Sequence, residues 1–272
     1  MKHIAFGQYY PAPSPLHALD ARMKVVLSVL YIVAAFLAKN VLSFGLLLGS
    51  ALLLLLISRI PPLAVMRTMR PVLFIVIITA IINFFFSNGE TVLFSFWVIN
   101  VYVEGIYNAV FMLVRILVLI FGTSIFLTYT TTPIALTDAI ESLLSPLRVF
   151  HLPVHEFAMM MSIALRFIPT LTEETYKIMS AQKARGVDFE SGNLLRRAKA
   201  LIPILVPLIV SSFRRADELA MAMECRAYRG GEGRTKMRRQ SITVWDFVAL
   251  FLVLLLIAGV VVLNSLGIGY TV

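Results

Sequence analysis

The run GIYNAVFMLVRILVLIFGTSIFL, residues 105–127, decides the fold class of this chain. It holds one charged residue, Arg115, over a length that exceeds the roughly 20 apolar residues needed to cross a bilayer. The rest of the chain has the same character: 59% of its 272 residues are hydrophobic, 14% are charged and the mean hydropathy is +0.88. This composition excludes an ordinary soluble domain and predicts an all-α integral membrane protein.

Further apolar runs bring the expected number of transmembrane helices to about five. The last run is long enough by itself, whereas the first three need their flanking residues to complete a crossing. The two runs on either side of Lys39 and Asn40 are interpreted as a helical hairpin. The four runs are Val25–Ala38, Val41–Ile57, Pro71–Phe86 and Val244–Leu263.

The basic residues predict which side of the membrane each loop faces. Arg22 and Lys24 precede the first span and the segment 129–243 is rich in Lys and Arg, whereas 87–104 has neither. Because short basic loops stay in the cytoplasm, we expect the N-terminus and the segment 129–243 to be cytoplasmic and the C-terminus to lie outside. The net charge of +9 then suits anionic lipid or an acidic protein partner, and binding to nucleic acid is not expected because no folded basic domain carries the charge.

The outer segment TVLFSFWVINVYVEG, residues 91–105, is rich in aromatic and β-branched side chains and too short to span a bilayer. It predicts either a small hairpin or an interfacial segment anchored by Trp97 and Tyr102.

The chain is therefore expected to have three parts. Residues 1–128 form a membrane domain with four spans, residues 129–243 form a cytoplasmic coupling region of long amphipathic helices, and residues 244–272 hold the last transmembrane helix. Within the coupling region, the stretch ALIPILVPLIVSSF, residues 200–213, is too short to cross a bilayer and contains two prolines. It predicts a helix in or under the membrane surface.

Three helical patterns divide the coupling region. Thr132 and Pro133 give a capping residue and a favourable first helical position, so the first helix begins there and stops near Ser145. The second runs from about Pro153 to Arg185, with Pro169 expected to kink it. The third begins after Gly192. Glycines are expected to end the second and third helices, namely Gly186 and the pair Gly230–Gly231.

One short pattern occurs twice, at the C-terminal ends of the second and third helices, in AQKARGVDF at 181–189 and AMECRAYRG at 222–230. Small residues flank the arginine, so the guanidinium is the only bulky group at the tip. Such a tip could enter a narrow groove on a partner and meet a carboxylate with two hydrogen bonds. The alternative is that the arginine only stabilises its own helix by about 0.3–1 kcal/mol, because its positive charge lies near the negative end of the helix dipole. The matching residues are Ala184, Arg185 and Gly186 in the first copy and Cys225, Arg226 and Ala227 in the second.

The chain resembles the transmembrane T component of energy-coupling factor transporters, which are prokaryotic importers of vitamins and metal ions. The resemblance lies in HALDARMK at 17–24, in TTTPIALTDAIESLLSPLRVFHLPVHEFAMMMSIALRFIPTLTEETYKIMSAQKARGVDF at 130–189 and in AMECRAYRG at 222–230, and it covers nearly the whole chain. Ala21, Cys225 and Ala227 depart from the usual proline, alanine and glycine.

The resemblance implies a scaffold in the cell membrane that links two cytoplasmic ABC ATPase subunits to a separate membrane-embedded S component, which captures the substrate. Arg185 and Arg226 would each dock into one ATPase. The chain itself would bind no cofactor, because the partner ATPases use the ATP and Mg.

Arg115 and a methionine cluster are the other candidate functional residues. A charge within a span is by default a functional candidate, and we expect no acid inside any span to pair with it. Asn83, helix carbonyls or water must therefore satisfy Arg115, in a structural role or in subunit docking. The cluster Met159, Met160 and Met161 either fills the core or gives S components a pliable contact surface.

Two other classes of function are less well supported. A stand-alone secondary transporter is the alternative, but it would need a binding site at the membrane midplane with acids or paired broken helices. An enzyme would need a cluster of His, Asp or Glu, and His151 with His155 lack a third ligand for a metal site. The segment GGEGRTKMRR, residues 230–239, lacks the Gly-Lys-Ser/Thr ending of a phosphate loop, so we expect no ATP hydrolysis by this chain.

Overall fold

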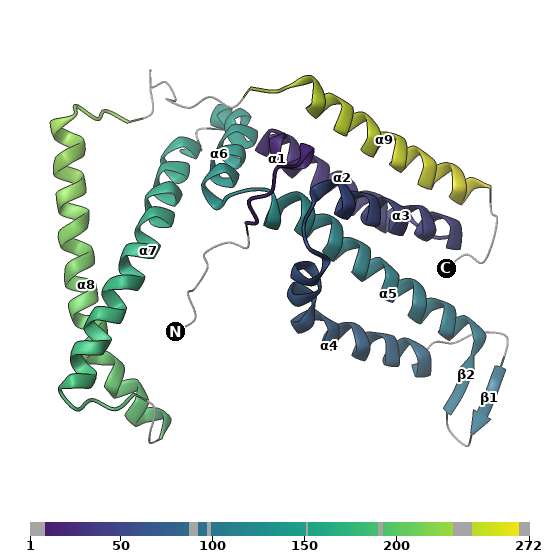
Figure 1. Cartoon of the computed structure of the whole chain (residues 1–272), viewed down its shortest axis with the longest axis horizontal. Coiled ribbons are helices and arrows are strands. Elements are labelled where there is room, and N and C mark those ends of the chain that lie inside the picture. Colours follow the sequence, from purple (N-terminus) through teal and green to yellow (C-terminus); the bar gives the residue numbers. More distant parts are fainter. Residues whose placement is uncertain are drawn as a thin grey trace. The chain divides into compact units, whose positions relative to one another are not determined.

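The computed structural model describes residues 9–86, 92–96, 99–150, 152–189, 193–230 and 241–266 (Figure 1). The chain divides into two compact units. Residues 1–139 with 238–272 form one, which we call the membrane unit, and residues 140–237 form the other, which we call the coupling unit. The division into three parts at residues 128 and 243 stays a prediction.

Helices joined by short loops make up the membrane unit. Its elements are α1 (Pro15–Ala18), α2 (Ala21–Leu37), α3 (Val41–Ser58), α4 (Pro62–Phe86), β1 (Val92–Phe96), β2 (Ile99–Tyr102), α5 (Val103–Thr123), the π-helical turn η1 (Ser124–Tyr129) and α9 (Val244–Ser265), and α6 (Pro133–Leu144) begins in it.

Each of the five expected spans lies in a helix. In the described part of the chain, three helices are long and apolar enough to cross a membrane: α3, α5 with η1, and α9. The helix α4 contains the shorter apolar stretch Val72–Phe84, and α2 has 17 residues. The all-α membrane class is confirmed, while α2 and α4 stay predicted spans.

The segment that is expected to lie outside folds as a hairpin, which confirms the first of the two alternatives. Strands β1 and β2 pair antiparallel, with Phe96 opposite Ile99 and Val92 opposite Tyr102. The Tyr102 side chain is half-buried, and Trp97 lies outside the described residues.

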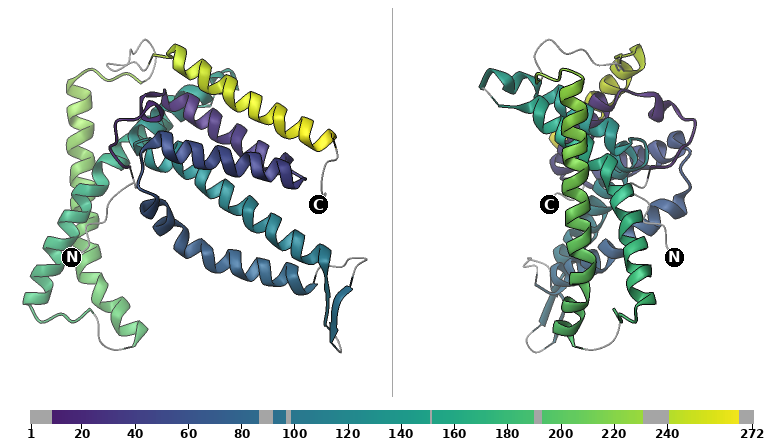
Figure 2. Two further views of the ribbon diagram at one scale, coloured as in Figure 1. Left: turned by 45° about the vertical axis from the view of Figure 1, so that its right-hand side comes forward. Right: turned by 90° about the vertical axis from the view of Figure 1, so that its left-hand side faces the viewer.

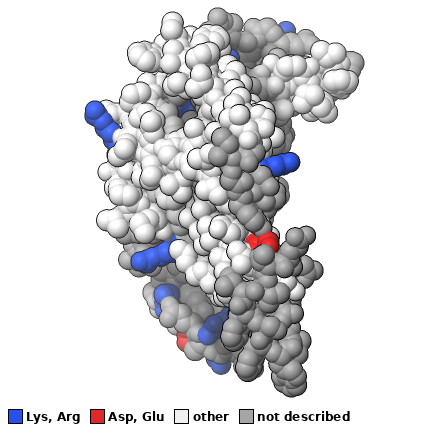
Figure 3. Space-filling view, turned by 90° about the vertical axis from the view of Figure 1, so that its right-hand side faces the viewer, with Lys and Arg blue, Asp and Glu red and all other residues white. Residues whose placement is uncertain are grey.

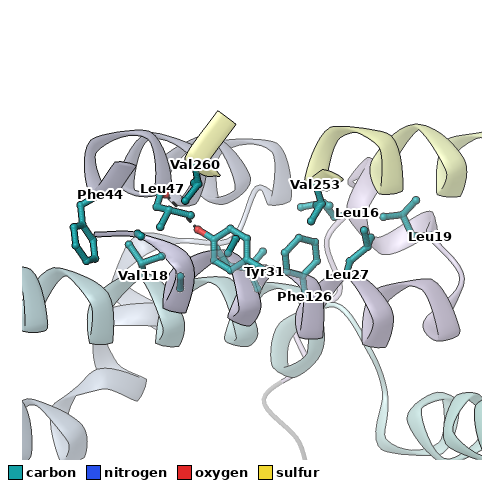
Figure 4. Close-up of a cluster of buried hydrophobic side chains, with 14 of the residues drawn as sticks. Leu16, Leu19, Leu27, Tyr31, Phe44, Leu47, Val118, Phe126, Val253 and Val260 are labelled. Carbon is teal, nitrogen blue, oxygen red and sulfur yellow. Dashed lines mark hydrogen bonds between the residues drawn. The ribbon is translucent and has the colours of Figure 1, made fainter. Parts of the chain in front are cut away.

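The helix α5 is the centre of the membrane unit, because it packs against α2, α3 and α4. The buried ring of Tyr31 on α2 lies in this core, where it meets Phe126 edge to face at 5.9 Å between centroids (Figure 4). The Tyr31 hydroxyl donates to the carbonyl of Leu47 at 3.3 Å, which ties α2 to α3 in the expected helical hairpin. The Tyr31 ring is also packed directly onto Gly122 of α5.

Polar contacts at both ends join the first span to the last. The carboxylate of Asp246 is fully buried near the start of α9 and accepts from the backbone N–H groups of Asp20 at 2.9 Å and Thr243 at 2.7 Å. At the other end, the Asn264 amide donates to the carbonyl of Leu37 at 2.6 Å. The helices α2 and α9 therefore run parallel and begin at the same face.

The outer surface of the membrane unit is apolar. Leu53 on α3, Ile75 on α4 and Phe251 on α9 are 55%, 58% and 65% exposed. Figure 3 shows only scattered charged groups on a large uncharged face. An exposed apolar surface of this extent is the one that a bilayer covers.

The Gly122–Tyr31 contact predicts that Gly122→Ala destabilises the membrane unit by about 1–3 kcal/mol, because a Cβ there overlaps a buried ring that cannot move away. Thermal unfolding in detergent measures the change. Gly49→Ala is the matched control, since a Cβ at Gly49 meets nothing within 4 Å. Equal melting temperatures for the two variants would contradict the close approach.

Candidate functional site

Two long helices carry the repeated arginine pattern. They are α7 (Val154–Ala184) and α8 (Leu194–Cys225), preceded by α6 and the 3-10 turn η2 (Ser145–Phe150). Thr132 caps α6 as expected, because its hydroxyl accepts from the N–H of Ala135 at 3.3 Å. Within the coupling unit α7 and α8 pack against each other and cross, with opposite chain directions (Figure 2). Their C-terminal ends consequently point in opposite directions.

The end of α7 is closed by its own backbone. Arg185 is the C-cap residue, and Gly186 follows with a φ of 86°, in the left-handed region. The N–H of Gly186 donates to the carbonyl of Lys183 at 3.0 Å, and the N–H of Val187 donates to that of Gln182 at 3.0 Å. This pair of bonds is the Schellman motif, which satisfies helix carbonyls that would otherwise lack donors.

The end of α8 repeats the same motif, bond for bond. Arg226 is the C-cap residue and Ala227 has a φ of 54°. The N–H of Ala227 donates to the carbonyl of Glu224 at 2.8 Å, and that of Tyr228 donates to Met223 at 3.0 Å. The expectation that Gly230 ends this helix is therefore wrong. The backbone bonds force Ala227 into the conformation that glycine adopts more easily.

Both tips are open to a partner. Ala184, Arg185 and Gly186 are exposed, and so are Cys225, Arg226 and Ala227. Among the described residues, neither guanidinium has a hydrogen-bond or ion-pair partner. The backbone amides alone close each helix, so the arginine side chains remain available for other contacts.

An ion pair holds the two helices together near their crossing. Glu174 on α7 accepts from the Ser211 hydroxyl at 2.5 Å and from the Arg215 guanidinium at 2.6 Å, both on α8. The two charged side chains are partly exposed, at 22% for Glu174 and 34% for Arg215. The Ser211 hydroxyl, and after it the Arg215 guanidinium, hold the pKa of Glu174 below its usual value. The carboxylate is therefore ionised at neutral pH.

Sequence reasoning missed this pair. The signal was present in the repeat, because Glu174 and Arg215 occupy equivalent positions when the two arginine patterns are aligned. In each helix they lie eleven residues before the C-cap arginine.

Arg115 supports a helix end inside the membrane unit. Its guanidinium donates to the carbonyl of Ala38, the C-cap of α2, at 2.9 Å and lies 5.3 Å from the centroid of the Phe44 ring. Of the expected partners, the structure thus places a helix carbonyl there, whereas the Asn83 amide donates to Thr79. A docking role for Arg115 stays a prediction.

The methionine cluster lies on the first half of α7. Met160 and Met161 are 58% and 40% exposed, and Met159 is half-buried. His155 hydrogen-bonds Glu141 at 2.9 Å, and His151 lies outside the described residues. In the part of the chain that the structure describes, no group of three or more His, Cys, Asp or Glu side chains is placed to hold a metal ion.

Comparison with known proteins places these features in one family. The family model described as CbiQ, cobalt transport protein, matches residues 12–237, which include both arginine tips and the crossing between them. The chain belongs to the CbiQ family.

Relatives of this CbiQ family member carry the name energy-coupling factor transporter transmembrane protein EcfT. The protein from Clostridium kluyveri is 49% identical over 258 residues, which cover 94% of this chain and 95% of the relative. The protein from Ruminiclostridium cellulolyticum is 50% identical over 246 residues, covering 90% and 91%, and that from Listeria innocua is 46% identical over 238 residues, covering 88% and 89%. The likeness to these proteins extends over almost the full length of each.

The two helix ends predict opposite effects of exchanging glycine and alanine. Ala227→Gly should stabilise the end of α8 and Gly186→Ala should destabilise the end of α7, each by about 1 kcal/mol, because only glycine occupies the left-handed region without strain. Hydrogen exchange of the Val187 and Tyr228 amides, which close the two motifs, measures the local effect. Faster exchange at Tyr228 in Ala227→Gly would contradict this account.

Proposed function

We propose that this chain is the transmembrane T component of an energy-coupling factor importer. In this role it couples ATP hydrolysis by two cytoplasmic ABC ATPase subunits to substrate release from a separate membrane S component. The close relatives named as transmembrane proteins of such transporters support this assignment. The transported substrate would be a vitamin or a metal ion, bound by the S component.

One observation carries the proposal: the same arginine-capped helix end occurs twice, pointing in opposite directions from one crossing. A single arginine at a helix end would be explained by the helix dipole. Two exposed copies whose arginines have no partner among the described residues match a partner with two similar acidic grooves, as a pair of ATPase subunits offers. Each planar guanidinium would bind a groove carboxylate through two hydrogen bonds.

This chain and its ATPase partners would have different roles in the importer. The chain would bind no cofactor, and ATP and Mg would act in the ATPase partners. The N-terminus and the coupling helices α7 and α8 would face the cytoplasm, as the distribution of Lys and Arg favours. Within the chain, α7 and α8 would pass the motion of the ATPases to the membrane unit.

The exposed methionines of α7 suit the second partner. An S component must bind and leave, and one scaffold could serve several of them. Thioether side chains are flexible and polarizable, so the surface formed by Met160 and Met161 could repack against different partners. The stand-alone transporter remains the weaker alternative, because it gives the two arginine tips no role.

Reversing both tip charges tests the ATPase partnership. Arg185→Glu with Arg226→Glu should leave the protein inserted and folded but reduce assembly with the ATPases by more than about 1,000-fold, because each reversal places like charges at a groove. Co-purification with the ATPases and ATP-driven uptake measure the effect.

Arg166→Glu with Lys199→Glu is the matched control, since both side chains are exposed and lie inside α7 and α8, away from the helix caps. It makes the same change in net charge and should assemble normally. Each single tip variant should show a milder loss, because one tip stays engaged. Full uptake by the double tip variant would refute the proposed mechanism.

The methionine surface is tested by Met159→Ala, Met160→Ala and Met161→Ala in combination. Loss of the pliable contact should weaken binding of at least one S component by about 1 kcal/mol or more. Met66→Ala, at a methionine of α4 with 60% exposure, is the control. Unchanged binding of every S component by the triple variant would remove this surface from the interface.

A further inference from the structure

The ion pair at the crossing joins equivalent positions of the two arginine patterns. Glu174 and Arg215 are 41 residues apart. The same spacing separates Arg185 from Arg226 and each of their flanking residues from its counterpart. The two members of the ion pair therefore lie at the same distance in sequence, eleven residues, before the arginine of each tip.

The contact between these two equivalent positions indicates that the C-terminal halves of α7 and α8 are related by a local two-fold axis. When two like elements are related by a two-fold axis, a residue that touches its own counterpart lies at that axis. The Glu174–Arg215 pair thus marks the axis that relates the C-terminal halves of α7 and α8. Because eleven residues follow the pair in each helix, each arginine lies about 16 Å along its helix from the axis.

The segments between the axis and the tips are built as continuous helix. The arms Thr175–Ala184 and Ala216–Cys225 contain neither glycine nor proline and are dominated by good helix formers. The prolines of the two helices, Pro169, Pro203 and Pro207, all precede the crossing. Each arm is therefore a rigid lever, and the register and angle at which the two helices cross set the distance between the tips.

We propose that Glu174 and Arg215 are positioning residues whose contact fixes the spread between Arg185 and Arg226, so that both tips dock on an ATPase pair at the same time. This inference rests on the proposed function for the identity of the partner. A partly exposed ion pair adds little to stability, but its directional hydrogen bonds select one register of one helix on the other.

The benefit of a fixed spread is avidity. Once one tip is docked, the second binds intramolecularly, which raises overall affinity about 100- to 10,000-fold when the spacing fits and adds nothing when it does not. Loss of the ion pair should therefore weaken binding to the paired ATPases without changing the affinity of either tip for a single ATPase subunit. A purely structural role would weaken both kinds of binding or neither.

The first experiment measures the spread in the isolated T component. Spin labels at Ala181→Cys and Ala222→Cys, two exposed and equivalent positions, report the distance between the arms in a Cys225→Ala background. The exchange Glu174→Arg places two cations at the crossing and should shift or broaden the distance distribution. Combining it with Arg215→Glu restores opposite charges and should restore the distribution. Glu173→Arg, at the exposed neighbouring carboxylate, is the control and should leave it unchanged.

The second experiment compares binding to the assembled ATPase pair with binding to one ATPase subunit held monomeric. Glu174→Arg should lose at least about tenfold in affinity for the pair while its affinity for the single subunit stays within about twofold, and the charge-swapped variant should recover most of the loss. Glu174→Gln, which removes the charge and keeps a similar shape, should lose affinity in the same direction.

The results separate this inference from the proposed function. An unchanged distance distribution in Glu174→Arg, or equal losses for the pair and the single subunit, would overturn the positioning role. Failure of the unaltered chain to bind any ATPase would instead overturn the proposed function, and the spin-label distances would still test the ion pair. The positioning role would also be contradicted if Glu174→Arg with Arg215→Glu kept both the altered distance distribution and the low affinity for the ATPase pair of Glu174→Arg alone.

Discussion

The last carbonyls of a helix need hydrogen-bond donors, and the way α7 and α8 meet this need determines what their arginines do. In both helices two backbone amides close the end, with a left-handed residue directly after the arginine. No side chain is required for capping. The guanidinium groups of Arg185 and Arg226 are consequently left for contacts outside the helix, while their positions are fixed by the backbone. Rigid placement of an unpaired charge is the property that a docking element needs.

Much of this end geometry was predictable from the sequence because it is local. Gly186 marked the end of α7, and the C-cap position of both arginines followed from the repeat. Glycine preference predicts a helix end at Gly230 instead of Ala227, because it does not include the demand of the backbone bonds, which alanine can meet at a moderate energetic cost. The Glu174–Arg215 pair was missed for a different reason. Charges on amphipathic helices are common, and only the crossing of α7 and α8 reveals which two meet.

The membrane unit shows the same limit of sequence reasoning. Hydropathy predicted that the chain would form membrane helices, but not how polar groups within the apolar core would be satisfied. Arg115 reaches a carbonyl at the end of the short helix α2, a contact that depends on where that helix stops relative to α5. Asp246, an acid inside the expected last span, was overlooked. It is buried because it caps its own helix and accepts the N–H of Asp20.

The path of the chain has a mechanical consequence. The coupling unit is inserted between residues 139 and 238 of the membrane unit, whose first and last spans are tied together by Asp246 and Asn264. Its two attachment points therefore belong to one body. Two connections to the same body restrict the rotation of the coupling unit more than a single connection would. Under the proposed function, a force on either arginine tip would therefore reach one and the same body through both of its chain connections.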